Sequence, residues 1–140
     1  MPSWTPNLLT GHATIDEQHR ELFDRVDALH RAMLAGDRNE TARLVAFLGK
    51  YVTQHFAAEE AEMRRTGFRF YETHRIQHVS FVRAFVDMEK ELRQRGPTAA
   101  VTIQTKQWLV GWLQTHILGT DVVLAAFLRE SSEADRHSIS

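Results

Sequence analysis

Apolar side chains recur every three or four residues along most of the chain, which is the spacing of residues on one face of an α-helix. Four such segments follow one another, and glycine or Gly-Pro positions separate most of them. We therefore expect four amphipathic helices, followed by a shorter helical piece near the C-terminus. Their approximate ranges are 14–36, 37–66, 72–95, 97–116 and 121–130, with residues 68–71 as a short connection.

The ends of these segments carry recognisable helix signals. Thr14, with a glutamate three residues later, fits a capping box at the first helix, and Asp37 can cap the second helix in the same way. Gly36 and Gly67 are suitable stop signals. Pro97 fits the first turn of the fourth helix, where its missing N–H is not needed.

Four amphipathic helices with short connections predict an all-α protein, an antiparallel up-down-up-down four-helix bundle. No β-hairpin signal or repeat interrupts the pattern. Residues 1–13 would form an N-terminal arm, and residues 131–140 a polar tail after a short C-terminal helix. With 140 residues, 43% of them hydrophobic, the chain fits a single domain covering 1–140.

Charge and cysteine content narrow the function classes. The formal net charge is −1 and no Lys/Arg cluster is present, so neither nucleic acid nor an anionic membrane is an expected partner. The absence of cysteine excludes disulfides, thiolate metal sites and a cysteine nucleophile. We see no apolar run of membrane-span length and no signal-peptide pattern, and therefore expect a cytoplasmic protein without membrane insertion.

Histidine is the unusual feature of the composition, with eight in the chain. A single histidine on a core-facing seam is more often structural than a metal ligand. Here, however, every predicted helix carries one, and in an antiparallel bundle they all fall at the same end, together with a glutamate. Burying these groups together without a partner would be costly, and a cation removes that cost. The residues concerned are His19, His55, Glu59, His74, His78 and His116.

Asp121 is a further candidate ligand, but it follows His116 by five residues. On an unbroken α-helix it would point roughly 140° away from His116. We therefore expect the chain to kink at Gly119, which would let Asp121 turn back to the same layer. The alternative is that Asp121 only caps the short helix that follows.

Five imidazoles and two carboxylates are too many for one ion. If two six-coordinate ions shared both carboxylates and one solvent oxygen as bridges, a single coordination position would remain open. An open coordination position suits dioxygen binding when the two metal ions can together supply two electrons. This favours iron, because zinc cannot supply electrons.

The order and spacing of these residues resemble the signature of the hemerythrin family, and in particular its single-domain bacteriohemerythrins. The flanking stretches "IDEQH" at 15–19, "HFAAEEAEM" at 55–63 and "WLQTHI" at 112–117 match as well. The resemblance covers roughly residues 4–128. It implies two iron ions bridged by Glu59, Asp121 and an oxo or hydroxo group. The metal ligands would be His74, His78 and His116 on one ion, His19 and His55 on the ion with the open position, and the two bridging carboxylates.

The resemblance also implies a function. The chain would bind dioxygen reversibly, for carriage, storage or sensing, and it would not be an enzyme. An oxygen-consuming enzyme is the candidate client, and a monomer is favoured over an oligomer. A pocket over the open position would be formed by Leu22, Phe56, Trp112 and Ile117, which could equally be ordinary core residues.

Two other functions remain open from the residues alone. One is a di-iron enzyme that acts on peroxide or nitric oxide; ferroxidase chemistry is disfavoured because such sites are rich in glutamate. The other is an interaction module that signals oxygen or redox state to a partner.

The remaining polar residues near these motifs are not expected to bind metal. His12, His30 and His137 fall outside the layer and are expected to be solvated or hydrogen-bonded. Glu60 and Glu62 are interpreted as surface charges. The candidates to orient the imidazoles are Gln18, Gln77 and Gln114.

Overall fold

The computed structural model describes residues 3–139, and it describes their side chains as far as residue 132. Within this part the chain is helical and contains no strand, which confirms the all-α prediction. The elements are the 3-10 turn η1 (Pro6–Leu8), α1 (Ala13–Leu34), α2 (Arg38–Thr66), α3 (Tyr71–Arg95), α4 (Ala99–His116), the π-helical turn η2 (Ile117–Asp121) and α5 (Val122–Ile139).

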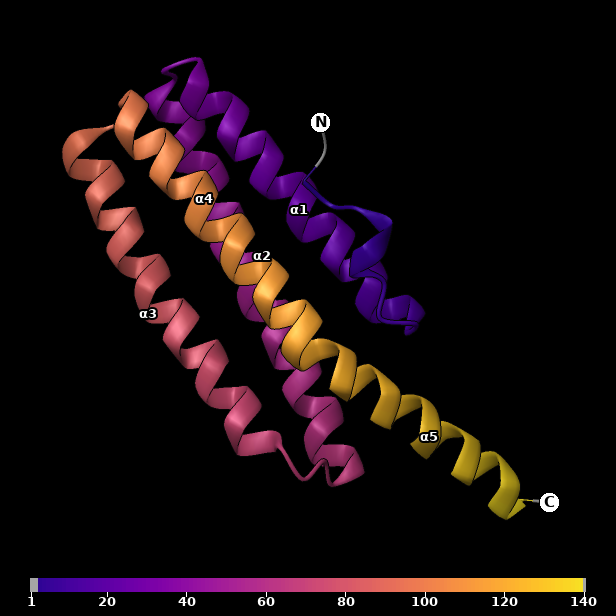
Figure 1. The fold of residues 1–140 in the computed structure, drawn as a ribbon. Helices are drawn as coiled ribbons and strands as arrows, with labels where there is room; N and C mark the ends of the chain where they lie inside the picture. Colours follow the sequence, from indigo (N-terminus) through magenta and orange to yellow (C-terminus); the bar gives the residue numbers. More distant parts are fainter. Residues whose placement is uncertain (1–2, 140) are drawn as a thin grey trace.

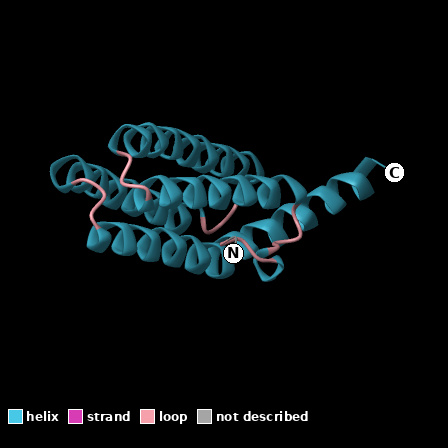
Figure 2. Ribbon diagram, turned by 90° about the horizontal axis from the view of Figure 1, so that it is seen from above, coloured by secondary structure: helices cyan, strands magenta, loops and turns pink. Residues whose placement is uncertain are grey.

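Helices α1 to α4 run alternately up and down and form a four-helix bundle (Figures 1 and 2). Each helix packs against two neighbours: α1 and α3 both contact α2 and α4. The core between them is formed by large apolar side chains such as Leu22, Phe23, Leu48, Phe81 and Leu109. The start of α1, the end of α2, the start of α3 and the end of α4 therefore meet at one end of the bundle.

Helix starts agree with the sequence in one case and differ in two. Asp37 caps α2, and its carboxylate accepts a hydrogen bond from Glu40 N at 2.9 Å. The capping box at Thr14 is wrong, because α1 begins at Ala13 and its cap is His12, two residues before Thr14. Pro97 precedes α4 and is not in its first turn; the cap is Thr98.

The predicted kink at Gly119 is also wrong. Its φ is not positive, and the chain passes from α4 to α5 through the π turn without leaving the helix. A π turn closes its hydrogen bonds over five residues instead of four, so it is wider than an α turn. Beyond it, α5 continues to Ile139, well past the expected end near residue 130 (Figure 1). The side chains of the predicted polar tail beyond residue 132 lie outside the described part.

The combined helix from Ala99 to Ser132 is long and apolar enough to span a membrane by length and hydropathy alone. This differs from the expectation that no segment reaches that limit. One helix of this kind is weak evidence for a span, and its first half packs inside the bundle against α1 and α3.

The segment before α1 is hydrogen-bonded to the first turn of α1 and to α5. Asp16 Oδ1 accepts hydrogen bonds from Thr10 N and Thr10 Oγ1 at 2.8 and 2.7 Å. Arg129 on α5 donates to Thr10 O at 2.6 Å. Gly11 has a φ of 88°, a left-handed backbone conformation that favours glycine. These contacts fix the first turn of α1, one turn before His19.

Candidate metal centre

The structure brings all seven predicted residues into one buried layer at the end of the bundle where α1 begins. α1 contributes His19, α2 contributes His55 and Glu59, α3 contributes His74 and His78, α4 ends in His116, and the π turn ends in Asp121. Each of the seven has a relative exposure of 4% or less.

Asp121 lies close to three of the five imidazoles. Its Oδ2 is 2.9 Å from His19 Nε2, and its Oδ1 is 3.1 Å from His74 Nε2 and 3.2 Å from His116 Nε2. The wide π turn explains how it reaches His116: residues five apart come closer to one face than on an α-helix. Asp121 thus joins the layer as expected, through a different backbone device.

Glu59 lies close to the other two imidazoles and to His74 as well. Its Oε1 is 3.3 Å from His78 Nε2, 3.4 Å from His55 Nε2 and 3.8 Å from His74 Nε2. All five imidazoles therefore direct Nε2 toward the two carboxylates.

The ligand atoms form two overlapping groups, within each of which they lie within 4.8 Å of one another. Both groups contain Glu59 and Asp121. The first adds His74, His78 and His116, and the second adds His19 and His55. Each set of imidazoles could hold one metal ion, and the two carboxylates that belong to both groups could contact both ions.

Many of these buried atoms have no hydrogen-bond partner among the described residues. They include both oxygens of Glu59, both oxygens of Asp121, both ring nitrogens of His19 and His74, and Nε2 of His78 and His116. Unpaired buried polar atoms are destabilising, and so many around one point are unusual for a folded protein. A cation between them would satisfy these atoms, so the donor set suits a metal site.

The pKa values of the cluster reflect burial and mutual charge. Burial raises the pKa of Glu59 well above its usual range, and the charge of Asp121 adds to this effect. Burial alone would raise the pKa of Asp121 too, but the charge of His116 and the close approach of the His19, His74 and His116 imidazoles outweigh it and hold that pKa well below its usual range. Burial lowers the pKa of His55 to about 3 and that of His78 to about 2. Those two imidazoles are therefore neutral near pH 7, which is the form that binds metals.

Three of the imidazoles have polar partners on their outward nitrogen. His55 Nδ1 is 2.5 Å from Gln18 Oε1, and His116 Nδ1 is 2.7 Å from Gln77 Oε1. These two glutamines do what the sequence suggested, whereas Gln114 makes no such bond within the described residues. His78 Nδ1 is 3.0 Å from Glu60 Oε2, so the interpretation of Glu60 as a surface charge is wrong.

Two of the four predicted pocket residues stack on imidazoles of the layer, and the other two are core residues. Leu22 and Ile117 are fully buried, and Phe56 stacks on His78 with ring centroids 3.8 Å apart. Trp112 stacks on His116 at 4.5 Å. Phe56 and Trp112 thus hold the planes of two imidazoles.

The other predicted polar residues lie away from the layer. His12 caps α1, and Glu62 pairs with Arg65 at 2.7 Å on the surface, as expected for a surface charge. His30 differs from expectation, because its Nδ1 is buried without a hydrogen-bond partner among the described residues. The side chain of His137 is outside the described part.

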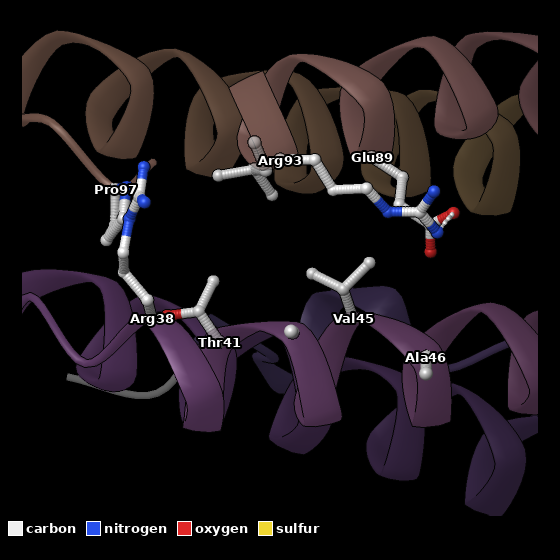
Figure 3. Close-up of a pocket in the computed structure, with 9 residues that line it drawn as sticks. Arg38, Thr41, Val45, Ala46, Glu89, Arg93 and Pro97 are labelled. Atoms are coloured by element: carbon white, nitrogen blue, oxygen red, sulfur yellow. Dashed lines mark hydrogen bonds and ion pairs between the residues drawn. The ribbon is translucent and has the colours of Figure 1, made fainter. Parts of the chain in front are cut away.

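A separate surface pocket of about 270 Å³ lies between the start of α2 and the end of α3 (Figure 3). None of the seven cluster residues lines it, and it sits at the opposite end of the bundle. Its lining residues are Arg38, Thr41, Ala42, Val45, Ala46, Glu89, Leu92, Arg93 and Pro97.

Fold and cluster together define a class, that of four-helix-bundle proteins with a histidine- and carboxylate-rich metal site between the helices. The family model of the hemerythrin HHE cation binding domain matches residues 10–128. The chain belongs to the hemerythrin family.

Relatives and solved structures agree with this assignment. The chain is 32% identical over 106 residues to a bacteriohemerythrin of Methylococcus capsulatus, covering 76% of this chain and 79% of that protein. It is 31% identical over 137 residues to a bacteriohemerythrin of Pseudomonas paraeruginosa, covering 98% of this chain and 83% of that protein. A crystal structure of wild-type hemerythrin superposes with a TM-score of 0.80 and 30% identity, covering 89% of this chain and 95% of that one.

Proposed function

We propose that this protein binds dioxygen reversibly at a pair of iron ions held by the seven buried side chains. The observation that supports this most directly is that Glu59 and Asp121 belong to two overlapping ligand groups. One ion would be held by His74, His78 and His116, the other by His19 and His55, and both would share the two carboxylates and an oxo or hydroxo bridge. The iron pair would supply the electrons and the open coordination position for dioxygen.

The surrounding residues have their own part in this function. Gln18 and Gln77 accept hydrogen bonds from Nδ1 of His55 and His116, which leaves Nε2 of both rings free to bind metal. Leu22, Phe56, Trp112 and Ile117 would form an apolar lining that limits water at the open position. Such a lining offers no general acid to the bound dioxygen, and this favours reversible binding over cleavage of the O–O bond.

The relatives support this proposal through their names, bacteriohemerythrin and hemerythrin. We further propose that residues 1–140 form a single hemerythrin-like domain, which acts as a cytoplasmic monomer. An oxygen-consuming enzyme is the client whose needs a dioxygen carrier would meet.

Anaerobic reconstitution tests the proposal. Metal-free protein receives ferrous iron, and O2 is then admitted and removed in repeated cycles. We expect two iron ions per chain and a visible absorption band that appears with O2 and disappears without it. The variant Glu59→Gln should lose the band, whereas Glu62→Gln, altered at an exposed position on the same helix, should keep it.

Two results would contradict the proposal. A band that forms once and never reverses would argue against reversible binding. Sustained turnover of peroxide or nitric oxide, faster than the band decays, would favour the enzymatic alternative.

A further inference from the structure

Glu60 gives one imidazole of the cluster an environment that the other four lack. Its Oε2 is 3.0 Å from His78 Nδ1, while Nε2 of the same ring is 3.3 Å from Glu59 Oε1. The Glu60 side chain is 20% exposed, so its carboxylate remains partly hydrated, but the ring it contacts is buried. His78 is therefore placed between two carboxylates.

The outward nitrogens of the other rings are treated differently. Those of His55 and His116 face neutral amide oxygens, and those of His19 and His74 have no partner among the described residues. Within the described residues, Glu60 is thus the one charged acceptor on an outward nitrogen of the cluster. It acts on the three-histidine group and not on the two-histidine group.

A carboxylate in this position has two physical effects. It holds the ring proton on Nδ1, so that the Nε2 lone pair faces the layer, and it makes the imidazole a stronger donor. It also adds a negative charge close to where a cation would sit, in a poorly solvated region where charges interact strongly. The Phe56 ring stacks on His78 with an interplanar angle of 6° and keeps the plane of that imidazole fixed.

We propose that Glu60 is a positioning residue that makes the two metal positions unequal, so that the position lined by His74, His78 and His116 takes up a divalent cation first and more tightly. The inference rests on the proposed function only in requiring that the cluster binds two ions. It predicts ordered loading, with the two-histidine position filled second.

Stepwise titration of metal-free protein with Co²⁺ tests this, with calorimetry for the affinities and visible absorption for the ligand environment. Wild type should show two separate binding steps. Glu60→Gln keeps an acceptor but removes the charge, and should weaken the first step by about 10- to 100-fold and shift its absorption band. The second step should change much less. Glu62→Gln removes a charge two residues away at an exposed, Arg65-paired position and should leave both steps as in wild type.

Thermal unfolding of the metal-free variants separates positioning from folding, and Glu60→Gln should unfold at the wild-type temperature. If Glu60→Gln fails to fold, Glu60→Asp replaces it in the titration. Aspartate keeps the charge but is shorter, so its carboxylate lies farther from His78, and we expect a smaller loss of affinity in the first binding step. A first step within twofold of wild type in the folded Glu60 variant, or an equal loss in Glu62→Gln, would overturn the inference while leaving the metal site intact. A wild-type protein that binds no pair of Co²⁺ ions would overturn the proposed function as well.

Discussion

Glu59 and Asp121 lie in the same buried layer, yet their pKa values move in opposite directions. Asp121 is within 3.2 Å of three imidazole nitrogens, and this close approach favours its ionised form. Glu59 has longer contacts and a neighbouring carboxylate, so burial dominates and raises its pKa. Burial thus opposes the ionised form of Glu59 in the metal-free protein, and the ionised form is the one that binds a metal.

The pH dependence of metal-free stability should follow from these shifts. The pKa of His55 is lowered from 6.5 to about 3 and that of His78 to about 2. Below pH 6.5 these two histidines therefore become protonated in the unfolded chain but stay neutral in the folded chain. Stability contributed by these histidines is lost as the pH falls. Glu59 acts in the opposite sense above pH 4.5, because its raised pKa lets the folded chain keep a proton that the unfolded chain loses.

Replacing Glu59 by Gln removes that opposing contribution. Between pH 6.5 and 4.5 we expect the thermal midpoint of the metal-free Glu59→Gln protein to fall more steeply on acidification than that of wild type. Circular dichroism in the presence of a chelator measures both. Equal slopes, or a midpoint that rises on acidification in the variant, would show that the assigned shifts are wrong.

Helical spacing and antiparallel order were sufficient to place six of the seven cluster residues at one end of a bundle. Asp121 was expected there only through a kink at Gly119, and the π turn brings it there instead. Glu60 could not be predicted in this way. It is adjacent to Glu59 and so points about 100° away around α2; only the placement of α3 beside α2 brings His78 within reach. Gln18 and Gln77 were reasonable candidates, but sequence could not separate them from Gln114, since that depends on side-chain conformation.

Among the helices, the π turn is where the sequence and the structure differ most. Five-residue spacing and a glycine indicated a broken helix, and a local widening of the turn achieves the same juxtaposition without a break. No simple sequence pattern distinguishes a kinked helix from a π turn, because glycine at position 119 is compatible with both backbone conformations. The predicted α2 cap and the glycine stops depend on local chemistry alone, and for that reason they were predictable.

The continuous helix makes a specific prediction about Gly119. A Cβ at this position would meet nothing within 4 Å and the backbone is helical, so Gly119→Ala should stabilise the protein by up to about 1 kcal/mol. Gly67 provides the contrast, because its φ is +67° at the end of α2. Gly67→Ala should cost about 1–2 kcal/mol. Chemical denaturation gives both values; a destabilised Gly119→Ala would instead support a kink that needs glycine.

The corrected start of α1 can be tested by two single substitutions. His12 Nδ1 accepts a hydrogen bond from Ile15 N at 3.3 Å, so His12→Ala should lower the free energy of unfolding by about 1 kcal/mol. Thr14 is exposed inside the helix, and Thr14→Ala should change it by less than about 0.5 kcal/mol. The reverse ranking in urea unfolding would restore Thr14 as the cap.

For the molecule as a whole, the metal should be a major source of stability. The bundle buries a layer of polar atoms that have no hydrogen-bond partner among the described residues, so binding a cation links to folding. At a metal concentration about 100 times the dissociation constant, one site adds about 2.7 kcal/mol. We expect Zn²⁺ or Fe²⁺ to raise the thermal midpoint by several degrees or more, and a chelator to reverse the rise. An unchanged midpoint would mean that the cluster is stable without a cation.

Anomalous diffraction from crystals of the iron-loaded protein would show whether two ions share Glu59 and Asp121. We expect two anomalous peaks, one beside His74, His78 and His116 and one beside His19 and His55, with both carboxylates between them. A single peak, or peaks away from this layer, would contradict this expectation.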